Sequence, residues 1–370
     1  MIIGIDASRA NREQKTGIEW YSYYLIQELK KIPLAPGDKF ILYTPFKLQG
    51  PLAEMPINWE ERVLKWPPKY LWTQVRLAWE MLFHPPGLLF VPAHCLPLFS
   101  SVKKVVTVHD LGFKHFAKTY SLFQRIYYFL SHYWSLKMAQ RIIVPSEFTK
   151  NDILKNFCSP RGKITVIPLG YTSKKNLSSS QFVSNLVLGK YKIKKPFFLY
   201  VGRLEKKKNI LGLIKAYQEL KKSKKEIEVP DLVLGGKSGY GYAEIKKEIS
   251  NSENIKEIGY IDSEDLSALY SSALALVFPS FYEGFGLPLL EAMANNCPVL
   301  ASKAGSLPEV GGMAALYFDP SDPEDIKNVM LKIIKDKELR QNLIKKGNQR
   351  IQLFSWKKCA QSTKKVLFSD

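Results

Sequence analysis

The sequence predicts an α/β protein of two doubly wound domains, each a parallel sheet with helices on both faces. Short apolar runs alternate with longer amphipathic stretches, and this succession occurs twice along the chain. Apolar runs of strand length, each followed by a helix, are typical of parallel strands buried on both faces. The chain of 370 residues also exceeds the usual size of one compact core, which favours two domains.

The predicted elements follow in order. In the first half, strands are predicted at residues 2–7, 40–44, 88–92, 105–110 and 141–146, and helices at 20–31 and 121–137. In the second half, strands are predicted at residues 197–202, 231–236, 255–260, 274–280, 298–302 and 315–319. Further helices are predicted after Asn209, Tyr242, Ser263, Leu287, Pro308 and Pro323.

The Ser- and Lys-rich stretch 171–196 has little clear period and predicts the boundary between the domains. The first domain is therefore predicted over residues 1–185 and the second over 196–353. Open parallel sheets bind ligands at the carboxyl ends of their strands. We therefore expect a ligand site in a cleft between two facing sheets.

The composition limits the class of protein. The net charge of +20 is spread over both halves, and it favours anionic partners or reflects a lysine-rich solvated surface. Cys95, Cys158, Cys297 and Cys359 are far apart and form no C-x-x-C motif, so neither a disulfide framework nor a zinc site is predicted. The chain shows no signal peptide and no apolar run of the roughly 18 residues that span a bilayer. We expect a cytoplasmic protein.

The stretch "FYEGFGLPLLEAMANN" (281–296) carries the strongest site signal. It follows a predicted strand, passes through Gly284 and Gly286, and enters a predicted helix with Pro288 in its first turn. Glycines let a backbone approach a ligand closely. The free N–H groups and the dipole of a helix start favour phosphate.

Two glutamates flank this predicted phosphate site. Glu291 lies about one turn into the helix, where a carboxylate beside a diphosphate is suited to accept hydrogen bonds from ribose hydroxyls. Glu283 precedes the glycines and is placed to accept from a second sugar. The alternative is a glycine loop with one solvated and one helix-stabilising glutamate.

Two cations follow the first strand of the second half. Arg203 comes directly after Gly202 at the strand end, and Lys208 lies five residues later. Both can neutralise a departing diphosphate. The alternative for Lys208 is a solvated lysine in a run of three.

The segments "YVGRLEKKKNI", "LVLGGKSGYG", "ALYFDPSDPEDI" and the long run from "IGYIDSEDL" to "SLPEV" resemble the donor-binding half of family-4 retaining glycosyltransferases with the GT-B fold. This resemblance covers most of residues 196–330. The first half, including "GIDASRANREQKTG" and "VVTVHDLGF", more loosely resembles bacterial members that build surface polysaccharides, often as mannosyl- or rhamnosyl-type transferases. The stretch 354–368 resembles the closing helix that packs back on the first domain.

The resemblance implies roles for individual residues. Arg203 and Lys208 would hold the donor diphosphate, Glu291 the ribose, and Glu283 the donor sugar. The remaining donor-binding positions implied are Gly17, Tyr260, Ile261, Gly284, Phe285, Gly286 and Leu287. His109 matches a histidine near the reacting sugar. Glu19 and Trp20 depart from the family, because many relatives have a second glycine and a basic residue there.

The chemistry implied is hexosyl transfer from a nucleoside-diphosphate sugar to a glycan or lipid-linked glycan, with retention of configuration. No convincing pair of metal-binding carboxylates occurs, since "DSED" and "DPSDPED" resemble helix starts. Cations and a helix terminus can replace a metal. We therefore expect no metal and no cofactor.

Residues 113–141 are aromatic and basic. This segment predicts either a helix packed on the first sheet with its aromatics inward, or a face that contacts an anionic membrane surface. A nucleotide-sugar epimerase of the same fold is the alternative enzyme. A nucleic-acid-binding protein explains the charge but neither the paired glutamates nor the glycine loop, so no nucleic acid is expected as a partner. No G-x-G-x-x-G follows either first strand, which argues against a dehydrogenase.

Overall fold

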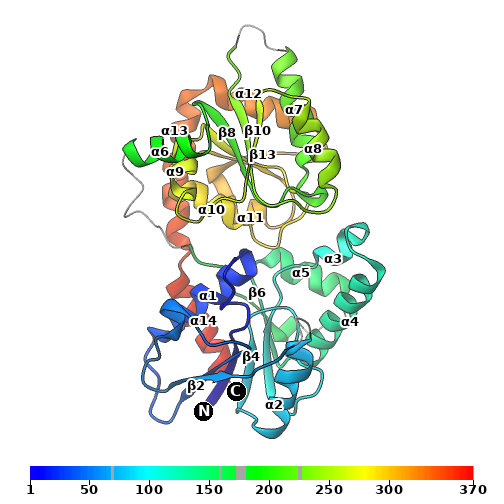
Figure 1. Ribbon diagram of the computed structural model, residues 1–370, viewed down its shortest axis with the longest axis vertical. Helices are drawn as coiled ribbons and strands as arrows, with labels where there is room; N and C mark the ends of the chain where they lie inside the picture. Colours follow the sequence, from blue (N-terminus) through cyan, green and yellow to red (C-terminus); the bar gives the residue numbers. More distant parts are fainter. Residues whose placement is uncertain (68–70, 158–160, 172–180, 224–226, 370) are drawn as a thin grey trace. The chain divides into compact units, whose positions relative to one another are not determined.

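The computed structural model describes the chain except for residues 68–70, 158–160, 172–180, 224–226 and 370. The chain divides into two compact units (Figure 1). The first unit comprises Met1–Gly170 and Phe354–Asp370, and the second comprises Tyr171–Leu353. Cys158 therefore lies outside the described residues.

The first unit is built on a parallel sheet of seven strands in the order β3-β2-β1-β4-β5-β6-β7. The strands are β1 (Ile2–Asp6), β2 (Lys39–Thr44), β3 (Trp59–Val63), β4 (Leu88–Val91), β5 (Lys103–Thr107), β6 (Arg141–Val144) and β7 (Ile164–Val166). Strand β1 pairs with β2 on one side and β4 on the other. The strand order therefore reverses beside β1, which is where open sheets of this type bind ligands.

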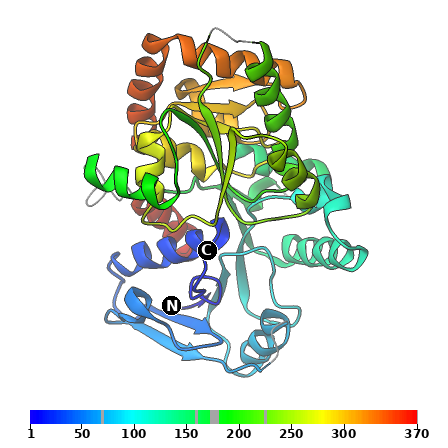
Figure 2. The same ribbon diagram turned by 45° about the horizontal axis from the view of Figure 1, so that its top comes forward.

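Helices cover both faces of this sheet. They are α1 (Gly17–Lys30), α2 (Ala78–Phe83), α3 (Gly112–His115), α4 (Leu122–Met138), α5 (Glu147–Asn156) and α14 (Trp356–Phe368), with short helices η1 (Gly50–Ala53), η2 (Trp72–Leu77), η3 (Ala117–Thr119) and η4 (Arg161–Lys163). The C-terminal helix α14 packs against α1 within this unit (Figures 1 and 2). Gly170 leaves no room for a side chain, because a Cβ there would collide with the backbone of Trp356.

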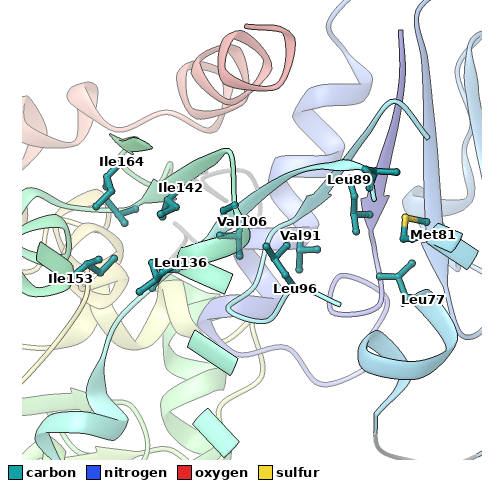
Figure 3. Close-up of a cluster of buried hydrophobic side chains, with 14 of the residues drawn as sticks. Leu77, Met81, Leu89, Val91, Leu96, Val106, Leu136, Ile142, Ile153 and Ile164 are labelled. Carbon is teal, nitrogen blue, oxygen red and sulfur yellow. The ribbon is translucent and has the colours of Figure 1, made fainter. Parts of the chain in front are cut away.

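The core on one face of this sheet joins three helices (Figure 3). Leu89 and Val91 occupy alternate positions on β4 and so share one face of the sheet. Val106 lies beside them on the adjacent strand β5. Met81 of α2 and Leu136 of α4 belong to the same buried cluster. Helices α2, α4 and α5 therefore share one buried side and lie over one face of the sheet.

The second unit repeats this architecture with six parallel strands in the order β10-β9-β8-β11-β12-β13. The strands are β8 (Phe197–Val201), β9 (Asp231–Gly235), β10 (Ile255–Gly259), β11 (Ala275–Phe278), β12 (Val299–Ser302) and β13 (Ala315–Phe318). The helices are α6 (Gln181–Lys190), α7 (Ile210–Ser223), α8 (Tyr242–Ser250), α9 (Leu266–Ser272), α10 (Leu287–Ala294), α11 (Leu307–Gly311), α12 (Pro323–Lys335) and α13 (Lys337–Arg350), with η5 (Lys206–Lys208), η6 (Gly312–Ala314) and η7 (Ile351–Leu353). The strand order reverses between β8 and β11, so their carboxyl ends form the predicted binding edge.

The prediction of two doubly wound parallel sheets is confirmed, and every predicted strand has its counterpart. Strands β3 and β7 lie outside the predicted strands. The sequence of β3, "WEERV", is polar because it pairs with β2 at the sheet edge. The predicted boundary at residue 185 falls inside helix α6, which packs against α9 of the second unit. The first unit therefore ends earlier, at Gly170.

Candidate functional site

The loop between β11 and α10 depends on glycine. Strand β11 ends at Phe278, and residues 279–286 lead into α10 at the carboxyl edge of the second sheet. Gly286 precedes the helix with a φ of 107°, which side chains with a Cβ rarely adopt. A Cβ there would also lie 2.6 Å from Cδ2 of Leu307. Pro288 lies in the first turn of the helix, as the sequence predicts.

Buried serines hold this loop from the next connection along the sheet. The Ser306 hydroxyl lies 3.1 Å from the carbonyl oxygen of Glu283 and 2.8 Å from that of Phe285, and the Ser306 N–H also donates to Glu283. Ser302 donates to the carbonyl oxygen of Ser280. A Cβ on Gly305 would lie 2.6 Å from the Glu283 carbonyl oxygen. The backbone around Glu283 is therefore fixed before any ligand arrives.

Lys208 and Glu283 form an ion pair, with 2.5 Å between Nζ and Oε1. Their side chains are only 16% and 13% exposed, respectively. The N–H of Phe281 donates to the carbonyl oxygen of Lys207, which ties η5 to the loop after β11. The sequence places both residues in one site, and the structure brings their charged groups together.

Arg203 follows β8 at the same edge, and its side chain is 61% exposed. Its guanidinium Nε lies 4.0 Å from Oε2 of Glu205, at the limit of an ion pair. Buried Tyr200 donates a hydrogen bond to the Arg203 carbonyl oxygen. Burial, followed by the carboxylates of Glu283 and Glu205, raises the pKa of Tyr200 well above its usual value, so this phenol stays a donor. The Arg203 backbone is thus anchored while its side chain reaches solvent.

Glu291 lies one turn inside α10, and a neighbouring helix fixes its carboxylate. The hydroxyl of Tyr270 on α9 donates to Oε2 of Glu291 at 2.8 Å. Tyr270 is fully buried, and burial together with the Glu291 charge raises its pKa well above the usual value. The Asn295 amide donates to the Glu291 carbonyl oxygen at 2.8 Å. The carboxylate is therefore oriented by a phenol that remains protonated.

Tyr260 and Ile261 follow β10 on the far side of β9. Tyr260 is exposed, and Nζ of Lys237 lies 4.7 Å from its ring centroid. Ile261 is buried, and it occupies the space that a Cβ on Gly235 would need. The predicted base-binding residues thus lie beyond the carboxyl end of the same sheet.

In the first unit, Gly17 opens α1, and a Cβ added there would meet nothing within 4 Å. Glu19, which departs from the family pattern, is buried. It accepts hydrogen bonds from the N–H and hydroxyl of Thr16, and lies 3.6 Å from Arg9 and 3.8 Å from Arg12. Glu19 is therefore the local counter-ion of two arginines in the loop before α1.

His109 follows β5 and is buried in a group of three imidazoles. Its ring Nε2 lies 3.1 Å from the carbonyl oxygen of Pro92, and its backbone N–H donates to Nδ1 of His94. The rings of His94 and His132 are 5.0 Å apart. Burial lowers the pKa of His109 and His94, and that of His132 to about 4. The group is therefore neutral at pH 7.

Comparisons with known proteins identify the family. Residues 189–350 match the family model "Glycosyl transferases group 1", and residues 16–174 match "Glycosyltransferase Family 4". The chain is 31% identical to the O-antigen chain mannosyltransferase B of Escherichia coli, over 94% of each chain.

The chain is a family-4 glycosyltransferase.

Other relatives agree with this assignment. The glycosyltransferase is 29% identical to O-antigen chain mannosyltransferase RfbU of Salmonella typhimurium, over 72% of this chain and 71% of RfbU. Its fold matches sucrose-phosphate synthase from Thermosynechococcus elongatus with a TM-score of 0.76 at 23% identity, over 99% and 98% of the two chains. It also matches WaaG, a glycosyltransferase involved in lipopolysaccharide biosynthesis, with a TM-score of 0.74 at 14% identity, over the whole of both chains. The fold is therefore GT-B.

The acidic side chains in the two predicted helix-start stretches of the glycosyltransferase cap a helix or form ion pairs. Asp322 accepts from the N–H of Glu324 at the start of α12. Asp262 and Asp265 both pair with Lys190. Within the described part of the chain, no three His, Cys, Asp or Glu side chains are grouped to hold a metal ion. None of its described helices combines the length and hydropathy of a membrane span.

Two supporting residues of the glycosyltransferase escaped prediction. Tyr270 and Ser306 are 21 and 23 residues from the groups that they hold. Their only sequence signal is position, since Tyr270 lies on the helix before β11 and Ser306 at the start of the helix after β12. A polar side chain at such a place is a candidate contact to the neighbouring loop, but its partner becomes visible only in the fold.

Proposed function

We propose that this glycosyltransferase moves a hexose, with mannose favoured, from a nucleoside-diphosphate sugar to a glycan or lipid-linked glycan. The transfer retains the anomeric configuration and needs no metal ion. The second unit binds the donor, and the first unit supplies the acceptor side. The proposal combines the family assignment with the geometry at the carboxyl edge of the second sheet.

The observation that carries this proposal is the ion pair between Lys208 and Glu283 at the loop before α10. Lys208 and Arg203 hold the donor diphosphate, together with the backbone of Gly284, Phe285, Gly286 and Leu287 at the helix start. Glu283 accepts hydrogen bonds from the donor sugar and Glu291 from the ribose. Tyr260 and Ile261 lie beside the base.

In the reaction, the bond between the anomeric carbon and the distal phosphate oxygen breaks, and its electron pair leaves with the phosphate. The acceptor hydroxyl oxygen bonds to the same face of that carbon. The hydroxyl proton passes to the departing phosphate oxygen. Lys208 and Arg203 lower the barrier because they stabilise charge that accumulates on the leaving group.

The first-unit residues have two roles in this proposal. The N–H at Gly17 approaches the donor phosphate from the start of α1. His109 lies near the reacting sugar, where its carbonyl group can stabilise developing positive charge. The Thr149 hydroxyl lies 3.4 Å from this carbonyl oxygen, and the neutral imidazole is held by Pro92. His109 therefore positions and stabilises, and it does not act as a cationic acid.

The choice of mannose and of a polysaccharide acceptor is supported by the names of the relatives. Two relatives matched over most of their length are O-antigen mannosyltransferases. One neighbour in fold, HepE of Anabaena, has been solved with UDP and glucose, which supports a nucleotide-sugar donor as the partner. We propose neither a cofactor nor a nucleic-acid partner.

We also propose that the enzyme works in the cytoplasm at an anionic membrane surface. A lipid-linked acceptor is embedded in such a surface. The net charge of +20 supports this location, because anionic lipids attract basic proteins.

A donor panel tests this function. Purified protein is mixed with UDP-, GDP-, ADP- and dTDP-sugars, and thermal shift identifies the donor that binds. That donor is then incubated with glycan acceptors in EDTA, and the anomeric configuration of the product is read by NMR. We expect a product with the donor's configuration. Conversion of the donor to its epimer without acceptor would identify the epimerase instead, and activity restored only by Mn²⁺ would contradict metal independence.

A further inference from the structure

The segment after β4 holds His109 at two points. The carbonyl oxygen of Pro92 accepts a hydrogen bond from the ring Nε2 of His109. The ring Nδ1 of His94 accepts a second one from the backbone N–H of His109, at 3.3 Å. Because Pro92 and His94 are two residues apart, one short segment fixes both the side chain and the backbone of His109.

Two other elements anchor this segment through Leu96. The N–H of Leu96 donates to the Ser135 hydroxyl on α4, and the side-chain amide of Gln74 in η2 donates to the Leu96 carbonyl oxygen. Leu96, Gln74 and Ser135 are all buried. The segment that carries His94 is therefore held in place by η2 and α4.

His109 lies where the chain leaves the sheet. The N–H of Val108 still donates to the carbonyl oxygen of Ile143 on β6. The next N–H along, that of His109, donates to the side chain of His94 instead of a strand. The Thr149 hydroxyl lies 3.4 Å from the carbonyl oxygen of His109. Side chains have thus replaced strands as the support of the His109 backbone.

The three neighbouring imidazoles carry their protons on different atoms. A carbonyl oxygen only accepts, so Nε2 of His109 carries a proton toward Pro92 and Nδ1 of His132 carries one toward Tyr128. Nδ1 of His94 faces a donor, so the proton of this neutral ring is on Nε2. His94 is therefore the imidazole whose lone pair supports the backbone of His109.

This lone pair is available at neutral pH. Burial, followed by the neighbouring His132 and His109, lowers the pKa of His94 well below its usual value. Arg9 acts in the same direction, and Asp110 acts against it. A proton on Nδ1 would place two N–H donors face to face, and the neutral ring avoids this contact.

We propose that His94 is a positioning residue for sugar transfer. It holds the backbone of His109 so that the carbonyl oxygen of His109 stays beside the reacting carbon, where positive charge develops in the transition state. His94 acts through His109, without touching the reacting atoms. This inference deepens the proposed function and rests on it, because it needs the role given there to the His109 carbonyl group.

Two variants of His94 separate the accepting atom from the ring. His94→Asn loses the ring but keeps an accepting oxygen near the place of Nδ1, whereas His94→Leu is apolar and cannot accept. We expect kcat for sugar transfer to fall about 10–100-fold in His94→Leu and less than about threefold in His94→Asn. The KM values of donor and acceptor should change less than about twofold in both, because the lost support acts in the transition state.

The matched control is His132→Asn, which removes another buried imidazole of the same group. The rings of His132 and His94 are 5.0 Å apart, but the Nδ1 of His132 bonds to the Tyr128 carbonyl oxygen on its own helix. This variant should lose stability and keep the kcat of the wild type. A loss of kcat as large as that of His94→Leu would overturn the proposal. So would equal losses in the two His94 variants, or a higher acceptor KM with an unchanged kcat.

Nuclear magnetic resonance tests the hold on His109 without turnover. In the wild type with isotope-labelled histidine, His94 should carry its proton on Nε2 and His132 on Nδ1. The backbone N–H of His109 should exchange with solvent more slowly in the wild type and His94→Asn than in His94→Leu. A proton on Nδ1 of His94 at neutral pH would overturn the proposal even if neither His94 variant folds.

These measurements separate a failure of the positioning role from a failure of the proposed function. Sugar transfer at equal rates by the wild type and His94→Leu would leave the function standing and reject the positioning role. A wild type that transfers no sugar from any donor would reject the function, and the positioning role with it, whatever the tautomers are.

Discussion

The loop before α10 and the helix α4 place their polar and apolar side chains in opposite ways. Around the loop, charged and polar groups are paired inside the second unit: Lys208 with Glu283, Tyr270 with Glu291, and Ser306 with two carbonyl oxygens. On α4, the large apolar side chains face solvent while serines and a histidine are buried. The loop is complete without a partner molecule, whereas the helix leaves its large apolar side chains exposed.

This difference shows what a catalytic loop requires. A catalytic loop must hold its charges in place before substrate binds, because reorganisation during the reaction raises the barrier. The exposed side of α4 has no such requirement, so its side chains need no partners in the free protein. The variants below test two points. The first is that the loop before α10 is fixed in the free protein, and the second is that the buried polar side of α4 contributes to stability.

The largest effect is expected for Lys208→Met. It removes the cation opposite the leaving diphosphate and leaves the Glu283 carboxylate without this counter-ion. We predict that kcat falls by about 10²–10³ while circular dichroism stays unchanged. Lys206→Met is the control, since Lys206 is exposed and pairs with Glu244. Equal losses in both variants would show that only general surface charge matters.

Gly305→Ala should break the loop through its backbone. Gly305 has a φ of 62°, and the added Cβ would lie 2.6 Å from the Glu283 carbonyl oxygen. We predict a loss of about 1–3 kcal/mol in the free energy of unfolding, measured by urea denaturation, together with weaker donor binding. Gly189→Ala in α6 is the control, because nothing lies within 4 Å of its Cβ. A neutral Gly305→Ala would mean that the loop adjusts freely.

The buried side of α4 should make the protein sensitive to acid. Burial lowers the pKa of His132 in the folded protein from its usual 6.5 to about 4. Between these values the unfolded chain binds the proton and the folded chain does not, so stability falls as pH drops through this window. We predict about 2 kcal/mol less stability at pH 5 than at pH 7 from this group.

Urea denaturation at the two pH values measures this slope. His132→Asn should make the slope shallower by this share and leave the part from His94 and His109, whose pKa burial also lowers. His84→Gln at an exposed position should leave the slope unchanged. A slope as steep in His132→Asn as in the wild type would assign the acid sensitivity to other groups.

Tyr270→Phe tests the support of Glu291. The variant removes a hydrogen bond to a carboxylate, and we predict about a tenfold rise in donor KM with a small change in kcat. The rise should vanish for a donor that lacks both ribose hydroxyls. Tyr217→Phe is the control, since the hydroxyl of buried Tyr217 donates to the backbone carbonyl oxygens of Pro230 and Asn254. It should lower stability without affecting KM.

Local pattern was enough to predict most of the fold. The apolar runs locate eleven strands, because strands buried on both faces leave a continuous signal. Edge strand β3 is polar and gives no such run. Helix α6 lies in a stretch whose composition indicates a linker, and only its packing on α9 shows that it belongs to the second unit.

Sequence spacing predicts candidate residues for the site but not the contacts between them. Spacing places Glu283, Glu291 and Lys208 at one sheet edge, yet the direct pairing of Lys208 with Glu283 joins groups 75 residues apart. The supporting roles of Tyr270 and Ser306 depend on similar long-range contacts. For α4, periodicity predicts an amphipathic helix, but it does not say which side faces the core.

The central claim is that fixed positive charge in the second unit binds the two linked phosphates of the donor. Isothermal titration calorimetry with the nucleoside diphosphate and monophosphate of the identified donor tests it most directly. We predict that the wild type binds the diphosphate at least about tenfold more tightly, and that Lys208→Met removes most of this difference. Equal affinity for both nucleotides in the wild type, or a difference that persists in Lys208→Met, would contradict the account.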